Sequence, residues 1–256
     1  MKSFKTKTIA VLNQKGGVGK TTSAVNIASF LAITETPVLL IDMDPQANAS
    51  TGIGIANKKL SIYDLLINNQ NINKTIYKTD IEYLDIIPSE SKLAGAEIEL
   101  VSMFTRETIL KQIIQNILGK YKYIIIDCPP SLGLLTINAL TASDSIIIPI
   151  QCEYYALDGL SQLLNTIRLV QKNLNSNLKI EGILITMFDS RLNLSQQVLK
   201  EVQDYFGDKV YKTLINRNVK LGEAPSHGKP IILYDASSTG SQNYMNLVSE
   251  ILQNND

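Results

Sequence analysis

The stretch Asn13-Gln14-Lys15-Gly16-Gly17-Val18-Gly19-Lys20-Thr21-Thr22 directly follows the apolar run 9–12. This order of residues predicts a strand that enters a glycine-rich turn, after which a helix begins. Glycines let backbone N–H groups approach an anion closely, and the positive end of the helix dipole favours a phosphate there. We expect residues 15–22 to bind a nucleotide, with Lys20 on its β- and γ-phosphates and the Thr21 hydroxyl on Mg²⁺.

A second lysine distinguishes this loop from the standard G-x-x-x-x-G-K-[ST] pattern. Five positions before Gly19 the residue is Gln14 rather than glycine, and Lys15 follows it. In this respect the loop resembles the deviant Walker A group, whose extra lysine reaches the nucleotide of a partner subunit. That resemblance implies a homodimer that forms with ATP.

Composition limits the classes of protein to consider. The 256 residues carry 24 basic and 24 acidic side chains, so DNA binding would have to rest on a local patch. Two cysteines, Cys128 and Cys152, form no C-x-x-C pair, which favours a reducing compartment. The N-terminus lacks the pattern of a signal peptide, and no run reaches the roughly 18 apolar residues of a membrane span. We therefore expect a cytoplasmic protein.

Short apolar runs alternate with segments of helical periodicity along the chain. The alternation predicts an α/β fold with a mostly parallel, twisted sheet and helices on both faces. No linker divides the chain, so we expect a single P-loop NTPase domain over residues 1–256. The expected strands are 8–12, 38–41, 84–87, 123–126, 145–148 and 180–186. The expected helices are 21–32, 89–101, 106–118, 132–140, 157–171, 195–206 and 241–252, with a polar loop at 67–73.

Two acids, Asp42 and Asp44, follow the second expected strand. Ligands of open α/β sheets bind at the carboxyl ends of the strands, so both acids should lie near the phosphates. Asp42 could hold Mg²⁺ through water, and Asp44 could orient or activate the attacking water. Taken alone, the run 42–45 is equally typical of a plain turn, because Asp and Pro favour turns. Its position after the phosphate loop favours the catalytic interpretation.

A third motif ends the apolar run 123–126 with Asp127. This is the Walker B pattern, in which the acid binds the metal directly or through water. Cys128 is expected to be a small buried residue, since no histidine stands near it to activate a thiolate. The one histidine of the chain, His227, gives no support for Ser-His-Asp or Cys-His chemistry.

Together the three motifs resemble the chromosome- and plasmid-partitioning ATPases of the ParA/Soj family, within the wider MinD/ParA group. The resemblance runs nearly end to end. It includes residues 46–48, 127–130, 157–160, 189–191 and 217–230.

The resemblance implies roles for the matching residues. Lys15 would act across the dimer, Lys20 and Thr21 would hold phosphate and Mg²⁺, and Asp44 would support hydrolysis. The adenine would lie near Met187, Arg217 and Asn218.

The family binds double-stranded DNA without sequence preference as an ATP dimer, and a ParB-type partner stimulates hydrolysis. The resemblance thus implies association with the nucleoid. The best candidates for DNA contacts are Arg191, Arg217 and Lys220. Residues 179–230 hold eight basic and six acidic side chains, so one copy offers a weak patch that a dimer would double.

Three alternatives remain. A MinD-like membrane-cycling ATPase would need a basic amphipathic C-terminal helix, whereas residues 237–256 contain no Lys or Arg. An iron–sulfur carrier on the same fold would need cysteines at a dimer axis or in a C-x-x-C pair. A catalytically dead binding module would not need the intact set Lys15, Lys20, Thr21, Asp44 and Asp127.

Overall fold

One twisted sheet organises the part of the chain that the computed structural model describes, residues 4–153 and 160–254. There, seven strands lie in the order β3-β4-β2-β5-β1-β6-β7. All neighbours are parallel except the β3–β4 pair. The predicted α/β fold is confirmed. The strands are β1 Lys7–Val11, β2 Val38–Asp42, β3 Tyr77–Lys78, β4 Leu84–Ile87, β5 Tyr123–Asp127, β6 Ser145–Gln151 and β7 Lys179–Thr186.

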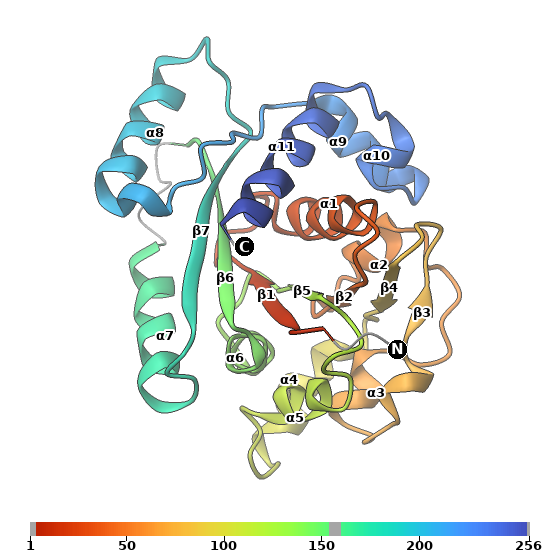
Figure 1. The fold of residues 1–256 in the computed structure, drawn as a ribbon. Helices are drawn as coiled ribbons and strands as arrows, with labels where there is room; N and C mark the ends of the chain where they lie inside the picture. Colours follow the sequence, from red (N-terminus) through yellow and green to blue (C-terminus); the bar gives the residue numbers. More distant parts are fainter. Residues whose placement is uncertain (1–3, 154–159, 255–256) are drawn as a thin grey trace.

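Helices cover both faces of this sheet (Figure 1). One face carries α1 (Lys20–Ala32) and α11 (Thr239–Gln253), and the other carries α6 (Leu134–Ala142) with α4 and α5. The remaining bounds are α2 Asn48–Gly52, α3 Ile62–Leu66, α4 Leu93–Val101, α5 Ile109–Gln115, α7 Leu160–Asn173, α8 Asn193–Phe206, α9 Val219–Glu223 and α10 Ile231–Tyr234. Three short 3₁₀ turns are η1 Ile72–Lys74, η2 Gly207–Lys209 and η3 Ala224–His227.

The central strands supply both hydrophobic cores. Along β1, Ile9 and Val11 face the core under α1 and α11, whereas Ala10 faces the core under α4 to α6. In β5 the side chains alternate in the same way. Alternation of this kind follows from the two-residue period of a strand, and burial on both faces explains why these strands read as continuous apolar runs.

Several element boundaries differ from the sequence prediction. The helices expected at 89–101 and 106–118 begin later, at Leu93 and Ile109. Residues 157–159 of the helix expected at 157–171 lie outside the described residues. The polar loop at 67–73 ends in the turn η1. The prediction missed β3 and the helices α2, α3, α9 and α10, because elements of two to five residues carry too little periodicity to be recognised.

Register places the acids of the predicted site side by side. Strand β5 lies between β1 and β2, and Asp127 at its carboxyl end pairs in register with Val11 on one side and Asp42 on the other. The loop after β1 leaves the sheet at the same edge. This edge therefore brings together segments that lie more than 100 residues apart.

Candidate nucleotide site

The loop between β1 and α1 forms an open cradle. Gly17 and Gly19 have φ values of +76° and +85°, which favour glycine, and Gly19 is the N-cap of α1. Side chains added at Gly16 or Gly17 would meet no atom within 4 Å, so space remains for a ligand over the loop. The first turn of α1 contains no acidic residue to compete for its free N–H groups. Local sequence thus builds a phosphate-sized cradle.

A cavity of about 620 Å³ lies over this cradle. It brings most of the predicted phosphate residues together with Asp44 and Met187. Its lining is Gly16, Gly17, Gly19, Lys20, Thr21, Thr22, Asp44, Pro45, Gln46, Asn48, Pro129, Pro130 and Met187. Val18, which is 1% exposed, does not line the cavity and instead packs inward.

Lys20 is the buried cation of the cavity. Its ammonium donates to the backbone carbonyl of Lys15 at 2.9 Å. Burial lowers the pKa of Lys20, and the nearby charges of Asp127 and Asp44 act in the opposite direction. A phosphate would supply the negative charge that burial leaves only partly balanced.

Lys15 does not line the phosphate cavity of its own chain. Its ammonium forms an ion pair of 2.5 Å with Glu153, and both side chains are partly exposed. The Asn13 carboxamide fixes the loop by accepting from the Lys15 N–H at 3.0 Å and donating to the Pro149 carbonyl at 2.7 Å. Sequence reasoning missed Glu153, which lies 138 positions away and carries no local signal.

The two acids of β2 and its loop occupy different surroundings. Asp42 is fully buried and accepts three hydrogen bonds, from Ser50 N (2.8 Å), Ser50 Oγ (2.7 Å) and Asp44 N (3.1 Å). Burial raises the pKa of Asp42 to about 6, although the Ser50 hydrogen bonds lower it. Asp44 lines the cavity and accepts from Gln46 N at 2.9 Å. Asp44 is thus the acid that a ligand would meet.

Asp127 is fully buried, and the Thr21 hydroxyl and the Lys20 ammonium compensate its charge only in part. Neither of its carboxylate oxygens has a hydrogen-bond partner among the described residues. Burial, followed by the charge of Asp42, raises the pKa of Asp127 well above the usual range, while the neighbouring Thr21 hydroxyl lowers it. An unpaired buried carboxylate next to a cavity is where a bound cation would be most stabilising.

These residues fit a magnesium ion that arrives with a nucleotide. The described residues contain no group of three or more His, Cys, Asp or Glu side chains that would hold a metal alone. Magnesium typically takes one or two protein ligands and completes its shell with phosphates and water. Thr21 lines the cavity and its hydroxyl lies next to Asp127, so these two residues are the best candidates for Mg²⁺ ligands, with Asp42 as a further candidate.

A second cavity, of about 450 Å³, continues from the first past Gly19, Thr22 and Met187. Arg217 and Asn218 line it, so the structure brings together the three residues expected around adenine. Met187 has a φ of +51°, in the left-handed region that non-glycine residues seldom adopt. The Asn218 side-chain oxygen accepts a hydrogen bond from Lys220 N at 2.8 Å, so the Asn218 Nδ2 group remains to donate to a base.

The three predicted DNA-binding cations lie outside both cavities or at their rim. Arg191 forms a bidentate ion pair with Asp189, with distances of 2.6 and 2.9 Å, which lowers the pKa of Asp189 to about 2. Lys220 pairs with Glu223 at 3.0 Å. The charge of Arg217 also acts on Asp189, which places Arg217 near Arg191.

The remaining predicted residues behave as the sequence indicates. His227 belongs to η3 and stacks on Tyr234 with ring centroids 5.0 Å apart, an arrangement that gives it no catalytic role. Cys128 is fully buried, and burial raises the pKa of its thiol well above the usual range. Neither residue resembles a nucleophile or its base.

A parallel sheet, a glycine loop before a helix and acids at adjacent strand ends define a P-loop nucleotide-binding protein. The family model described as an AAA domain (AAA_31) matches residues 6–180. The sporulation initiation inhibitor protein Soj of Bacillus subtilis is 59% identical over 250 residues, which is 97% of this chain and 99% of Soj. The chromosome-partitioning ATPase Soj of Treponema pallidum is 50% identical, over 96% of this chain and 97% of its own. The chain belongs to the Soj/ParA family.

A solved structure shares the whole fold. Cobyrinic acid a,c-diamide synthase from Mycobacterium smegmatis, with bound ADP and magnesium, has a TM-score of 0.85 at 35% identity. The match covers 97% of this chain and 94% of that one. The described residues contain no helix that is long and apolar enough to cross a membrane.

Proposed function

We propose that this chain is a slow, Mg²⁺-dependent ATPase that moves DNA by cycling between a DNA-bound dimer and a free form. The observation that carries the proposal is the position of Lys15. Lys20, Thr21 and Asp44 line the phosphate cavity, whereas Lys15 lies outside it in an exposed ion pair. A lysine in that position is available to a second copy of the site.

Each residue of the site has a distinct task in hydrolysis. The loop N–H groups and Lys20 hold the phosphates, and Thr21 with Asp127 and Asp42 hold the Mg²⁺ shell. Bound Mg²⁺ supplies the positive charge that neutralises the phosphates during transfer. Asp44 orients the attacking water, because it is the one acid of the three that lines the cavity. Met187, Arg217 and Asn218 hold the base.

On dimerisation, Lys15 leaves Glu153 and binds the phosphates of the nucleotide in the partner subunit. Two copies then present Arg191, Arg217 and Lys220 together to the backbone of double-stranded DNA, without sequence preference. A ParB-type partner would stimulate hydrolysis and release the DNA. The protein would be cytoplasmic and would associate with the nucleoid while ATP is bound.

Membrane cycling fits the C-terminal helix poorly. Along α11, Tyr244, Leu247, Val248 and Ile251 are buried, so the apolar face of this helix packs into the core with α1. A membrane-binding helix would need that face free. Binding to DNA is therefore the better proposal for the output of the ATPase.

The central experiment measures DNA retention with ATP, ADP or no nucleotide across a salt series. We expect binding with ATP alone that weakens steeply with salt. The variant Asp44→Ala should accumulate an ATP-bound dimer in light scattering. The variant Lys15→Ala should keep nucleotide binding but stay monomeric and lose DNA. A dimer that forms unchanged in Lys15→Ala would refute the role across the interface.

Charge reversal tests the DNA surface. Arg191→Glu with Lys220→Glu should abolish retention while the ATP dimer remains. The matched control is Lys111→Glu with Lys120→Glu, which changes net charge equally at exposed positions outside the predicted DNA-binding set. Equal losses of DNA binding in both double variants would mean that only net charge matters. DNA binding that persists in Arg191→Glu with Lys220→Glu would mean that the DNA surface lies elsewhere.

A further inference from the structure

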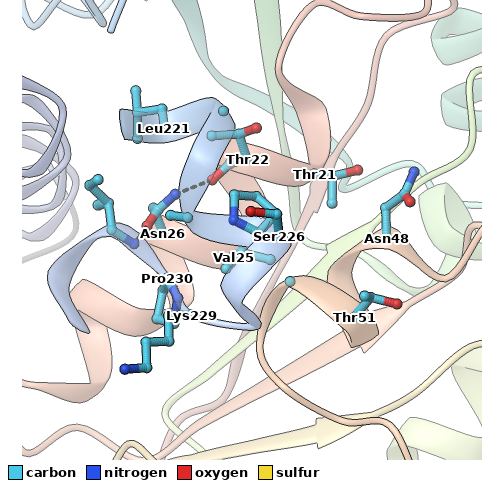
Figure 2. A pocket seen from close by; sticks show the side chains of 15 residues that line it. Thr21, Thr22, Val25, Asn26, Asn48, Thr51, Leu221, Ser226, Lys229 and Pro230 are labelled. Carbon is cyan, nitrogen blue, oxygen red and sulfur yellow. Dashed lines mark hydrogen bonds between the residues drawn. The ribbon is translucent and has the colours of Figure 1, made fainter. Parts of the chain in front are cut away.

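A cavity of about 460 Å³ separates α2 from the segment 218–230, which contains α9 and η3. Figure 2 shows Asn48 and Thr51 on one side of it, Leu221, Ser226 and Pro230 on the other, and Thr21 and Thr22 of α1 between them. Beside this cavity, α2 and the segment 218–230 lie in contact. The nature of that contact decides how firmly the two elements are joined.

Glycines make the contact. A Cβ atom added at Gly54 would lie 2.9 Å from the carbonyl oxygen of Gly228, and one added at Gly228 would lie 3.1 Å from the Gly54 Cα. Both residues have positive φ, +87° and +63°. Next to them, a Cβ at Gly52 would meet Pro225 at an ordinary 3.7 Å. The two backbones thus approach more closely than any pair of side chains would allow.

One side of the contact leads to the phosphates. Ser50 of α2 donates twice to Asp42, and Gly54 N donates to the Thr51 carbonyl at the end of the same helix. Asp44, which lines the phosphate cavity, lies between Asp42 and α2 in the chain. A rigid run of hydrogen bonds therefore connects the acids to Gly54.

The other side leads to the predicted DNA contacts. Gly228 N donates to the Pro225 carbonyl and Lys229 N to the Ala224 carbonyl, which closes η3. Helix α9 precedes η3 directly and holds Lys220, with Asn218 as its N-cap. Beyond η3, Ile231 N donates to the Asn26 carboxamide of α1. The segment 218–230 is thus a small stiff unit.

We propose that the Gly54–Gly228 backbone contact is the joint through which the segment carrying Asp42 and Asp44 sets the position of the segment carrying Lys220. The inference rests on the proposed function, because it assigns to this contact the coupling between ATP and DNA. Close-packed contacts transmit small shifts instead of absorbing them. A joint without side chains has no flexible group that could yield when α2 moves.

The experiment measures a coupling factor, the ratio of the DNA dissociation constants with ADP and with ATP. Gly54→Ala should reduce this factor by about ten-fold or more, and Gly228→Ala by less, because its closest contact is longer. Affinity for ATP should stay within about three-fold of wild type, since the phosphate loop does not touch the joint. The matched control is Gly207→Ala, whose φ is +55° but whose added Cβ meets nothing within 4 Å.

The outcomes separate cleanly. A coupling factor that stays at the wild-type value in both Gly54→Ala and Gly228→Ala overturns the inference. A loss of equal size in Gly207→Ala also overturns it, since general strain would then be the cause. If Gly54→Ala does not fold, Gly228→Ala alone decides by the same comparison. A wild-type protein whose DNA binding does not respond to ATP would instead refute the proposed function.

Discussion

Replacing Asp127 with asparagine should stabilise the nucleotide-free protein and abolish its response to Mg²⁺. Asp127 is fully buried, and neither carboxylate oxygen has a hydrogen-bond partner among the described residues. Burial and the charge of Asp42 raise its pKa well above the usual range. Asparagine has nearly the same shape and no charge, so the variant removes the electrostatic cost and adds only the cost of an unpaired amide.

The magnitude follows from proton linkage. The unfolded carboxyl titrates near 3.8, so at pH 7.5 a carboxyl that stays protonated in the folded state costs at most about 5 kcal/mol. The asparagine amide leaves its own buried donors unpaired, which costs about 1–3 kcal/mol. We therefore expect a net gain of at most about 2–4 kcal/mol in the free energy of unfolding. In a chain of this size that raises Tm by about 4–8 °C.

The sign depends on pH. Above pH 4, Asp127 holds more protons in the folded protein than in the unfolded chain, so the contribution of Asp127 to the free energy of unfolding falls as pH rises. The variant lacks this loss. Its advantage should therefore disappear at pH 4.5, where the linkage cost falls to about 1 kcal/mol and the unpaired amide offsets it.

Urea denaturation at pH 7.5 and 4.5, without nucleotide, measures both values. The control is Asp204→Asn, which removes an exposed carboxylate of α8 and should change stability little. With ATP present, added Mg²⁺ should raise the Tm of the wild type and not of Asp127→Asn. A variant that is less stable at pH 7.5, or equally favoured at both pH values, would refute the reasoning.

Three further predictions concern the surroundings of the site. Glu223→Gln should raise DNA affinity about two-fold at low salt, because Lys220 loses its intramolecular partner; filter retention without any change would contradict it. Ser50→Ala should lower the free energy of unfolding by about 1–3 kcal/mol and raise the pKa of Asp42 above about 6, because its hydroxyl donates to that carboxylate. Urea melts and the pH dependence of stability measure both effects. Tyr244→Phe should cost about 1 kcal/mol in the same melts, since the Tyr244 hydroxyl hydrogen-bonds the Ser23 hydroxyl at 3.0 Å inside the core.

Local signals explain what could be predicted. The glycine loop, the paired acids and Asp127 each follow an apolar strand, and parallel strands bring their carboxyl ends to one edge. That rule alone predicts that the acids Asp42 and Asp127 lie beside the phosphate loop, although they are about 30 and more than 100 positions away from it in the sequence. The short helix α3 was missed although Ser61 and Asp64 form a capping box that the sequence displays. Two-residue β3 has no such signal.

Contacts that depend on tertiary geometry could not be predicted. Ser50 lies on a five-residue helix and bonds Asp42 with both its N–H and its hydroxyl, yet its sequence neighbours are unremarkable for a ligand site. Glu153 reaches Lys15 because β6 ends beside the loop. The Gly54–Gly228 approach involves two loops whose glycines look like ordinary turn residues. Each depends on the distance between elements, which no local pattern encodes.

Three of the four cations assigned to the switch are paired within one copy. Lys15, Arg191 and Lys220 contact Glu153, Asp189 and Glu223 at 2.5, 2.6 and 3.0 Å. Exposed ion pairs of this kind are weak and easily exchanged, so a phosphate can replace any of these three carboxylates. One copy therefore offers DNA little free charge, whereas two copies held together offer twice the phosphate contacts at once. In the proposed cycle, dependence on ATP needs no change in the charge of the chain, because Lys15 would exchange Glu153 for the partner's phosphates and thereby create the doubled surface.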